Sequence, residues 1–312
     1  MADRRTHEEG STTRVGRAAS ESVQAGGIDT PGTLPTVGQA RAATGMTSFR
    51  EPSARSRADD LARYYDLDLR DDPGDLDLYR ALLTRRPGPI LELAAGSGRL
   101  AVPLALAGHD VVALDNDPAM LARTIALWTA RRGRRPVDRL RTIEADLTTV
   151  RLDERFGMVF IGLNSLLLMA DEDAQAAALR TIAAHLAPDG VAVVDVLLPD
   201  AADLALYDGR LLVEWVRRDP ETEEQVVKLA SARHDAATAT VDLTQIFDAS
   251  PADGGPVRRV IREDRLRLLT ARELTLMATA AGLAVEDVVG DYQMTPLGPG
   301  AERAVLLARL VQ

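Results

Sequence analysis

The sequence has no cysteine, four histidines and a single lysine, Lys228, in 312 residues. The absence of cysteine excludes disulfide bonds, thiol nucleophiles and cysteine-bound zinc. The scarcity of histidine leaves few candidates for imidazole acid–base catalysis. Long hydrophobic runs are also missing, since no stretch approaches the roughly 18 apolar residues of a membrane-spanning helix. These absences favour a protein that does not span a membrane and performs no thiol chemistry.

Acidic residues outnumber basic ones. Lysine and arginine total 37, aspartate and glutamate total 47, and the formal net charge is -10. Such a charge repels nucleic-acid phosphates and anionic lipids, so we expect neither nucleic acid nor a membrane as a partner. The first residues, MADRRTHEEG, lack the apolar core of a secretory signal, and we expect a cytoplasmic protein. We expect it to be a monomer or a homodimer.

The first 50 residues differ in character from the rest of the chain. Residues 1–50 are rich in Ser, Thr, Gly, Ala and charged residues and show no periodic apolar pattern. A segment of this composition cannot bury enough apolar surface to fold, so we predict a disordered tail. The remaining residues, 51–312, are long enough to form one domain with a sizeable core.

Helical and strand patterns alternate from residue 56 onward. Two helical segments come first, and Pro73-Gly74-Asp75 marks the start of the second. Buried-strand patterns follow at residues 90–93, 110–115, 140–144, 156–163 and 190–198, with helical patterns at 99–107, 117–133 and 171–186 between them. This alternation predicts a doubly wound α/β fold, in which helices cover both faces of a parallel sheet.

The alternation stops between residues 210 and 268. Four β-rich segments occur there, separated by turn sequences such as DPET and SPADGGP, and they predict an antiparallel insertion after the fifth strand. Thr270 and Glu273 then form a capping box that starts another helix. The last two strand patterns, AVEDVVGDY and RAVLLARLV, are joined by a loop too short for a helical crossover and should pair antiparallel. The predicted sheet has seven strands, mostly parallel.

A glycine turn follows the first strand, in the stretch ILELAAGSGRL. Gly96 and Gly98 can adopt positive φ and let a ligand approach the backbone closely, as nucleotide-like cofactors require. The hexapeptide from Gly96 to Ala101 also satisfies the loose dinucleotide template Gly-x-Gly-x-x-Gly/Ala. The glycine spacing therefore leaves two classes open, one of which is an NAD(P)-dependent oxidoreductase.

The sequence from about residue 64 to residue 310 resembles the class I S-adenosylmethionine-dependent methyltransferases. The family pattern E-x-x-x-G-x-G is matched by Glu92, Gly96 and Gly98, and the acid that closes its second strand by Asp115. An acid shortly after the third strand is matched by Asp146. The predicted terminal hairpin also fits this family better than the dinucleotide dehydrogenases.

The resemblance implies roles for these residues. Glu92 would accept from the ammonium group of the cofactor, directly or through water, Asp115 would bind both ribose hydroxyls, and Asp146 with Leu147 would border the adenine. The predicted cofactor site comprises Tyr65, Glu92, Ala94, Gly96, Ser97, Gly98, Asp115, Asn116, Met120, Asp146, Leu147 and Asn164. The structural alternatives are that Glu92 is an incidental strand residue, Asp115 caps a helix and Asp146 forms a solvated turn.

Within the class, the sequence is most similar to small-molecule N-methyltransferases of the glycine and amino-sugar type. Tyr65-Asp66 matches their N-terminal YD, and residues 210–268 match their β insertion. The resemblance implies that Tyr65 lies near the transferred methyl group and that the insertion forms a substrate cap. After the fourth strand, Asn164 is followed by Ser165 rather than by the proline of the N-P-P-Y pattern, which disfavours adenine and glutamine amides as substrates.

The histidines provide one further candidate. His109 lies in a helix-to-strand turn and His185 at the end of an amphipathic helix, where a structural role explains each of them. His234 lies on the insertion and could face the substrate, together with Trp215, Arg217 and Tyr292. No group of residues, including Asp195 at the end of the fifth strand, has the spacing of metal ligands, so we expect no metal.

These observations predict methyl transfer from S-adenosylmethionine to a small molecule or a peptide end. An amine acceptor needs no dedicated base because its proton can leave to water, whereas an alcohol usually requires one. The shortage of histidine therefore favours an amine nitrogen, with Tyr65 and His234 as the predicted catalytic residues. The alternatives are an O-methyltransferase with His234 as its base, an NAD(P)-dependent oxidoreductase, and a cofactor-binding protein without catalytic activity.

Overall fold

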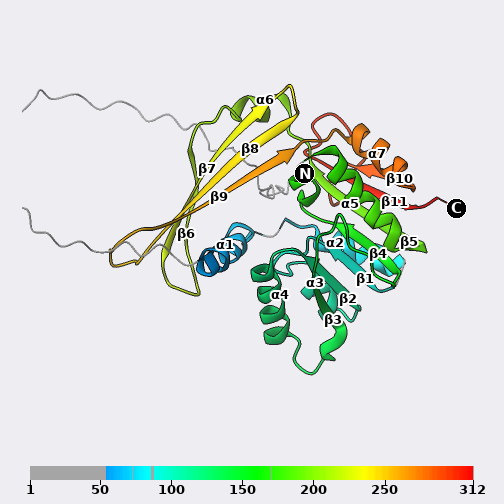
Figure 1. Ribbon diagram of the computed structural model, residues 1–312, viewed down its shortest axis with the longest axis horizontal. Helices are drawn as coiled ribbons and strands as arrows, with labels where there is room; N and C mark the ends of the chain where they lie inside the picture. The colour runs from blue at the N-terminus through cyan, green and yellow to red at the C-terminus, as the bar shows by residue number, and fades with distance from the viewer. Residues whose placement is uncertain (1–53, 72, 86–87, 170, 312) are drawn as a thin grey trace, which may run out of the picture.

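The computed structural model describes residues 54–71, 73–85, 88–169 and 171–311. The predicted tail at residues 1–50 lies outside these ranges. The described chain forms two sheets, a large one covered by helices and a smaller one that extends away from it, with one helix between them (Figure 1).

The large sheet has seven strands in the order β10-β11-β5-β4-β1-β2-β3. Its strands are β1 (Ile90–Leu93), β2 (Val111–Asp115), β3 (Leu140–Glu144), β4 (Phe156–Ile161), β5 (Leu186–Leu197), β10 (Leu283–Val289) and β11 (Arg303–Leu310). β1 pairs parallel with β2 and β4, whereas β11 runs antiparallel to both β5 and β10. The predicted doubly wound, mostly parallel sheet with a terminal hairpin is confirmed.

Helices cover both faces of this sheet. The helices and 3-10 turns of this part are α2 (Leu76–Arg85), α3 (Ala101–Leu106), α4 (Pro118–Arg131), η1 (Val137–Arg139), η2 (Ser165–Leu168), α5 (Glu172–His185) and α7 (Ala271–Ala280). Side chains of α2, α3 and α4 share one core cluster with one face of the strands, and side chains of α5 and α7 share another with the opposite face. No helix among the described residues is long and apolar enough to cross a membrane.

The local signals at helix starts act largely as predicted. Asp117 caps α4, because its side chain accepts a hydrogen bond from the amide of Ala119 and Pro118 occupies the first turn. Thr270 caps α7 by accepting from the amide of Glu273 at 3.1 Å. The carboxylate of Glu273 contacts Arg267 at 2.6 Å, so Glu273 forms an ion pair between α7 and the end of β9, and only the Thr270 half of the predicted capping box is formed.

Two predicted boundaries were wrong. The helix predicted from residue 99 begins at Ala101, because the glycine turn continues through Leu100 before helical hydrogen bonding is established. The fifth strand begins at Leu186 rather than Gly190, and its pairing with β4 shifts register between Leu186 and Val191. The APDG sequence, predicted to end the helix before a new strand, therefore forms an irregularity inside β5.

The smaller sheet contains the four strands of the predicted insertion. They are β6 (Leu212–Arg218), β7 (Gln225–Asp235), β8 (Thr240–Ser250) and β9 (Arg258–Arg267), paired antiparallel in sequence order and preceded by α6 (Ala201–Leu206). The remaining helix, α1 (Ala54–Asp68), packs on one face of this sheet. Tyr64 of α1 is fully buried and stacks on Phe247 with ring centroids 4.9 Å apart.

Candidate active site

The turn after β1 has left-handed backbone at three alternate residues. φ is +57° at Ala94, +56° at Gly96 and +82° at Gly98. Glycine tolerates such angles, whereas they strain alanine. The amide of Ala95 donates to the carbonyl of Leu114 at 2.9 Å, which ties the turn to β2. These constraints hold one backbone conformation at the carboxyl edge of the large sheet.

Asp115, the last residue of β2, fixes the same turn through its side chain. Its Oδ2 accepts from the amide of Gly96 at 2.7 Å, and its Oδ1 accepts from the amide of Asp117 at 2.9 Å. The helix-capping role considered for Asp115 belongs to Asp117. Each carboxylate oxygen can accept more than one hydrogen bond, so Asp115 can orient the loops and still accept from a ligand.

The two glycines of the turn are needed for different reasons. A Cβ on Gly98 would lie 2.8 Å from Cγ2 of Thr124, so glycine permits the close approach of α4. A Cβ on Gly96 would lie 3.6 Å from Cε1 of Tyr65, whose ring covers the turn. Thr124 also donates to the carbonyl of Gly96 at 2.9 Å. Gly98 thus serves packing, while Gly96 leaves space between the backbone and Tyr65.

Glu92, in the middle of β1, is buried with one oxygen unpartnered. Its Oε2 has no hydrogen bond in the described part of the chain. Burial raises the pKa of Glu92 to about 8, against the opposing effects of Arg99 and the amide of Ala101, while Asp75 raises it further. A buried carboxyl of this kind is complementary to a cationic ligand group, since such a group would restore its ionised form.

A buried ion pair joins the glycine turn to the segment before α2. Arg99 donates to both carboxylate oxygens of Asp75, each at 2.6 Å, and Asp75 is fully buried. The bidentate geometry fixes both groups in position. The stretch around Pro73 and the glycine turn are therefore attached to each other.

A second polar cluster lies at the carboxyl ends of β4 and β5. Asp195 is fully buried and accepts from Nε of Arg303 and from the hydroxyl of Tyr292, both at 2.8 Å. Asn164 has φ +68°, and its Oδ1 accepts from the amide of Leu197 at 2.7 Å and from Nη2 of Arg303 at 3.0 Å. Since both clusters occupy the carboxyl edge of the sheet, they lie where open α/β sheets bind their ligands.

Comparison with known proteins identifies the family. A model of the methyltransferase domain matches residues 90–190, which contain the glycine turn, Asp115 and Asn164. A cypemycin N-terminal methyltransferase from Streptomyces sp is 28% identical over 207 residues, covering 66% of this chain and 77% of that protein. These matches show an S-adenosylmethionine-dependent methyltransferase with the class I fold. The oxidoreductase alternative is thereby excluded.

Solved structures share the fold of this methyltransferase. An S-adenosylmethionine-dependent methyltransferase from Clostridium acetobutylicum superimposes with a TM-score of 0.66 at 19% identity, covering 81% of this chain and 98% of that one. A sugar N-methyltransferase from Streptoalloteichus sp gives a TM-score of 0.64 at 24% identity, covering 88% of this chain and 100% of that one. Because more than 80% of this chain is covered in each case, the structural similarity includes more than the large sheet.

The methyltransferase gathers most of the predicted site residues around the glycine turn. Tyr65 and Glu92 lie against it, and Ser97 within it is 4% exposed. Met120, in the first turn of α4, is 8% exposed, whereas Asn116 is exposed between β2 and α4. These residues lie around the glycine turn, and their role in binding the cofactor stays a prediction.

Three other predicted residues have partners away from the glycine turn. Asp146 accepts at Oδ1 from both the amide and the hydroxyl of Thr148, at 2.8 and 2.7 Å, and this contact lowers its pKa. Leu147 is buried in the core beside α5. Asn164 belongs to the Asp195 cluster. Their contact with adenine or with the rest of the cofactor remains a prediction.

The histidines differ in environment. His185 is 1% exposed, with Nδ1 2.7 Å from the carbonyl of Thr181 and Nε2 accepting from the amide of Leu152 at 2.9 Å. These partners require a neutral ring with its proton on Nδ1, in agreement with the predicted structural role. His234 pairs with Val241 near the end of β7, and its ring forms no hydrogen bond within the described residues.

Two residues predicted as possible substrate neighbours, Trp215 and Arg217, attach α1 to the smaller sheet. The indole of Trp215 donates to Asp68 at 2.8 Å, and the guanidinium of Arg217 bonds to the carbonyl of Leu67 and to Asp71. Lys228 is 3% exposed and contacts Asp68 at 2.5 Å. The third such residue, Tyr292, belongs to the Asp195 cluster.

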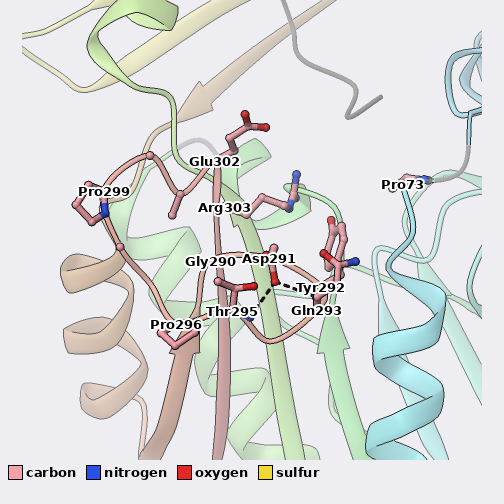
Figure 2. Close-up of a pocket in the computed structure, with 13 residues that line it drawn as sticks. Pro73, Gly290, Asp291, Tyr292, Gln293, Thr295, Pro296, Pro299, Glu302 and Arg303 are labelled. Atoms are coloured by element: carbon pink, nitrogen blue, oxygen red, sulfur yellow. Dashed lines mark hydrogen bonds between the residues drawn. The ribbon is translucent and has the colours of Figure 1, made fainter. Parts of the chain in front are cut away.

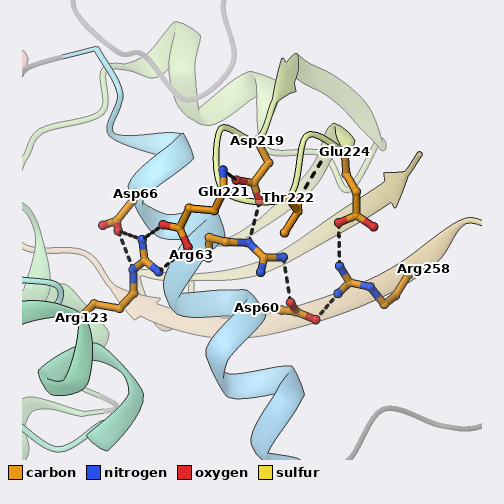
Figure 3. Close-up of polar contacts among 9 residues, drawn as sticks. All are labelled: Asp60, Arg63, Asp66, Arg123, Asp219, Glu221, Thr222, Glu224 and Arg258. Atoms are coloured by element: carbon orange, nitrogen blue, oxygen red, sulfur yellow. Dashed lines mark hydrogen bonds and ion pairs between the residues drawn. The ribbon is translucent and has the colours of Figure 1, made fainter. Parts of the chain in front are cut away.

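Further ion pairs connect α1, the β6–β7 turn and α4 (Figure 3). Arg123 of α4 contacts Asp66 of α1 at 2.5 Å and Glu221 of the β6–β7 turn at 2.6 Å. Arg63 of α1 contacts Asp219 of the same turn at 2.6 Å. The helix that carries Tyr65 is thus attached to both sheets. Sequence reasoning missed this network because its members are far apart and follow no local motif.

Sequence reasoning also missed Asp75, Arg99 and Arg303 as site residues. Arg99 lies within the glycine motif, and Asp75 lies within the turn predicted before α2. The sequence marks both segments, but it does not predict that these two residues form an ion pair. Arg303 carries no sequence signal. No cluster of potential metal ligands occurs among the described residues.

Proposed function

We propose that this methyltransferase acts on an amine nitrogen of a small molecule or of a peptide amino terminus. The shared reaction of its family is methyl transfer from S-adenosylmethionine. The observation that carries the choice of nitrogen is the position of Tyr65, whose ring lies over the glycine turn. Its phenol keeps its proton at neutral pH, and burial raises its pKa further, to about 12. A protonated phenol can orient an acceptor but cannot remove a proton from an alcohol.

The proposed cofactor site is the cluster around the glycine turn. Bound S-adenosylmethionine supplies a methyl group on a positively charged sulfur, which makes it susceptible to displacement. Glu92 offers its unpartnered oxygen to the ammonium group, and Asp115 offers free lone pairs to the ribose hydroxyls. Gly96 carries no side chain, and a Cβ on it would lie 3.6 Å from Cε1 of Tyr65. Because Glu92 lacks a partner and Gly96 lacks a side chain, these residues suit the cofactor.

The chain's contribution to the reaction is to position the acceptor. Tyr65 lies over the glycine turn and can accept a hydrogen bond from an amine while its own proton stays on the phenol oxygen. Holding a neutral amine in line with the methyl group can contribute several kcal/mol through proximity alone. The amine proton then leaves to water, and no protein base is required.

We further propose that residues 210–268 act as the substrate cap. Their sheet faces α1, which carries Tyr65. The ion pair of Arg63 connects their β6–β7 turn to α1, and that of Arg123 connects the same turn to α4, which covers the large sheet. Replacing residues 210–268 by a short linker should preserve cofactor binding and abolish turnover. Loss of cofactor binding in a folded variant would contradict this division of labour.

The test is methylation of paired acceptors that differ only in carrying an amine or a hydroxyl group, detected by mass spectrometry. We expect methylation at nitrogen. His234→Ala should lower kcat less than about tenfold, since a general base contributes about 10² to 10⁴. Tyr65→Phe should lower kcat more than it weakens binding of S-adenosylhomocysteine. Activity on hydroxyl acceptors alone, or loss of activity in His234→Ala with intact cofactor binding, would instead support an O-methyltransferase with His234 as its base.

A further inference from the structure

A cavity of about 650 Å³ lies beside the Asp195 cluster. Figure 2 shows Pro73 on one side of it and the loop 290–303, between β10 and β11, on the other. β10 runs parallel to β5, because both are antiparallel to β11, so this loop lies at the carboxyl edge of the large sheet. The cavity therefore opens at the same edge as the glycine turn and has the size of a ligand site.

The wall of the cavity is attached to the proposed cofactor site. Pro73 lies two residues before Asp75, whose carboxylate forms the bidentate pair with Arg99 of the glycine turn. Asp75 also adds to the rise in the pKa of Asp195, which burial chiefly causes. The cavity and the glycine turn are thus connected by contacts and lie within electrostatic reach of each other.

Arg303 is the hydrogen-bond donor that this cavity offers a ligand. Its Nε and Nη2 are directed to Asp195 and Asn164, while its Nη1 forms no hydrogen bond in the described part of the chain. Its side chain is 15% exposed and lines the cavity. Tyr292 also lines the cavity, but its hydroxyl is already directed to Asp195. Arg303 thus leaves its Nη1 group, which carries two N–H donors, available to a ligand in the cavity.

The charges around Arg303 favour a neutral acceptor of this hydrogen bond. Asp195 already neutralises the guanidinium at 2.7 Å, and Asp291 adds a negative charge to the lining. A ligand carboxylate would meet net repulsion, whereas an amide carbonyl accepts a hydrogen bond without adding charge. The same negative lining attracts the ammonium form in which an amine arrives.

We propose that this cavity binds the first residues of a peptide, with Arg303 donating to a backbone carbonyl near the amino terminus and so directing the terminal nitrogen toward the glycine turn. The inference rests on the proposed N-methylation and narrows its acceptor to a peptide amino terminus. The prolines that line the cavity, Pro73, Pro296 and Pro299, provide apolar contact for side chains. An amino sugar, whose oxygens are mostly hydroxyls, uses a carbonyl-binding donor less well.

The experiment measures steady-state methylation of a randomised tetrapeptide amide library with free amino termini, and of a panel of amino sugars. Arg303→Gln should raise the peptide KM about 10- to 150-fold, as expected for a lost charge-assisted hydrogen bond, and leave S-adenosylhomocysteine affinity within about twofold. The matched control is Arg309→Gln on the same strand, an arginine that contacts Glu286 at 3.4 Å and should be silent.

Arg303→Gln leaves Asp195 buried without its ion partner and could unfold the protein. The double variant Asp195→Asn/Arg303→Gln replaces the ion pair by two neutral amides and should retain the fold while keeping the raised KM. The effect of either variant on a simple alkylamine that lacks a carbonyl should be less than about threefold. A purely structural role would change both acceptors equally.

The possible outcomes separate this inference from the proposed function. Methylation of amino sugars but not of any library peptide would overturn the peptide assignment and leave N-methylation intact. If peptides are methylated and their KM is unchanged in a folded Arg303 variant, Arg303 does not bind the peptide. Activity on hydroxyl groups alone would overturn the proposed function itself.

Discussion

Replacing Glu92 by glutamine should change how cofactor binding depends on pH. Glu92 has a pKa of about 8 in the cofactor-free protein, so it is almost fully protonated at pH 6. If its carboxylate pairs with the cofactor ammonium, it must lose its proton on binding. Ionising a group of pKa 8 at pH 6 costs about 3 kcal/mol. Binding at pH 6 should therefore release close to one proton, and affinity should rise about tenfold from pH 6 to pH 7.

The assay is isothermal titration calorimetry with S-adenosylhomocysteine at pH 6, in two buffers that differ in ionisation enthalpy. The difference between the observed enthalpies gives the number of protons released. Glu92→Gln should release none and should bind with an affinity that is flat from pH 6 to 7. Glu144→Gln, a change at an exposed acid at the end of β3, serves as the control and should behave as the unmodified protein does. Proton release that persists in Glu92→Gln, or is absent from the unmodified protein, would refute the assignment.

Glu92→Gln should also change the stability of the cofactor-free protein. The folded-state pKa of Glu92 is raised above the ordinary glutamate value of 4.5 to about 8, so the folded protein holds the proton more tightly than the unfolded chain. Stability therefore falls as pH rises between these two values. At pH 7, Glu92→Gln should stabilise the cofactor-free protein by up to about 3 kcal/mol, and the gain should shrink toward pH 4.5 in thermal unfolding.

Three further predictions concern neighbouring groups. Asp115→Asn should weaken S-adenosylhomocysteine binding about 10- to 150-fold in calorimetry, and an unchanged affinity would remove Asp115 from the cofactor site. Gly98→Ala should lower the midpoint of urea unfolding, because its Cβ would lie 2.8 Å from Thr124, and a midpoint equal to that of the unmodified protein would contradict the packing argument. Lys228→Ala should destabilise the fold by about 3 to 5 kcal/mol, since it leaves Asp68 and Glu214 without their buried partner; a loss below 1 kcal/mol would make the pair dispensable.

Much of the fold could be predicted because its signals are local. The strands β1, β2 and β4 are buried almost continuously, so their sequences are apolar apart from Glu92 in β1 and Asp115 at the end of β2. Capping residues such as Asp117 bond to amides two or three positions away and mark helix starts directly. The boundary at residue 99 was wrong because left-handed residues extend the glycine turn, and periodicity carries no information on backbone angles at glycine.

The site could be predicted only in part. Glu92, Gly96 and Asp115 follow a fixed spacing along consecutive strands, so their proximity follows from the fold. The partners of Asp195 come from positions 97 and 108 residues away, and hydrogen bonding across such separations leaves no trace in one sequence. Tyr65 could be placed from its family resemblance, but the ion pairs that hold α1 over the glycine turn could not.

The attachment of α1 to the cap has a consequence for synthesis of the chain. Asp60 of α1 bonds to Arg258, which follows 198 residues later. At about 5 to 20 residues per second, α1 leaves the ribosome roughly 10 to 40 seconds before this partner is made. During that interval the apolar face that carries Tyr64 has no sheet to cover it. The cluster that buries Tyr64 is completed only when β9 forms, because Val260 belongs to it, and a chain that stops before residue 258 lacks the contact between Asp60 and Arg258.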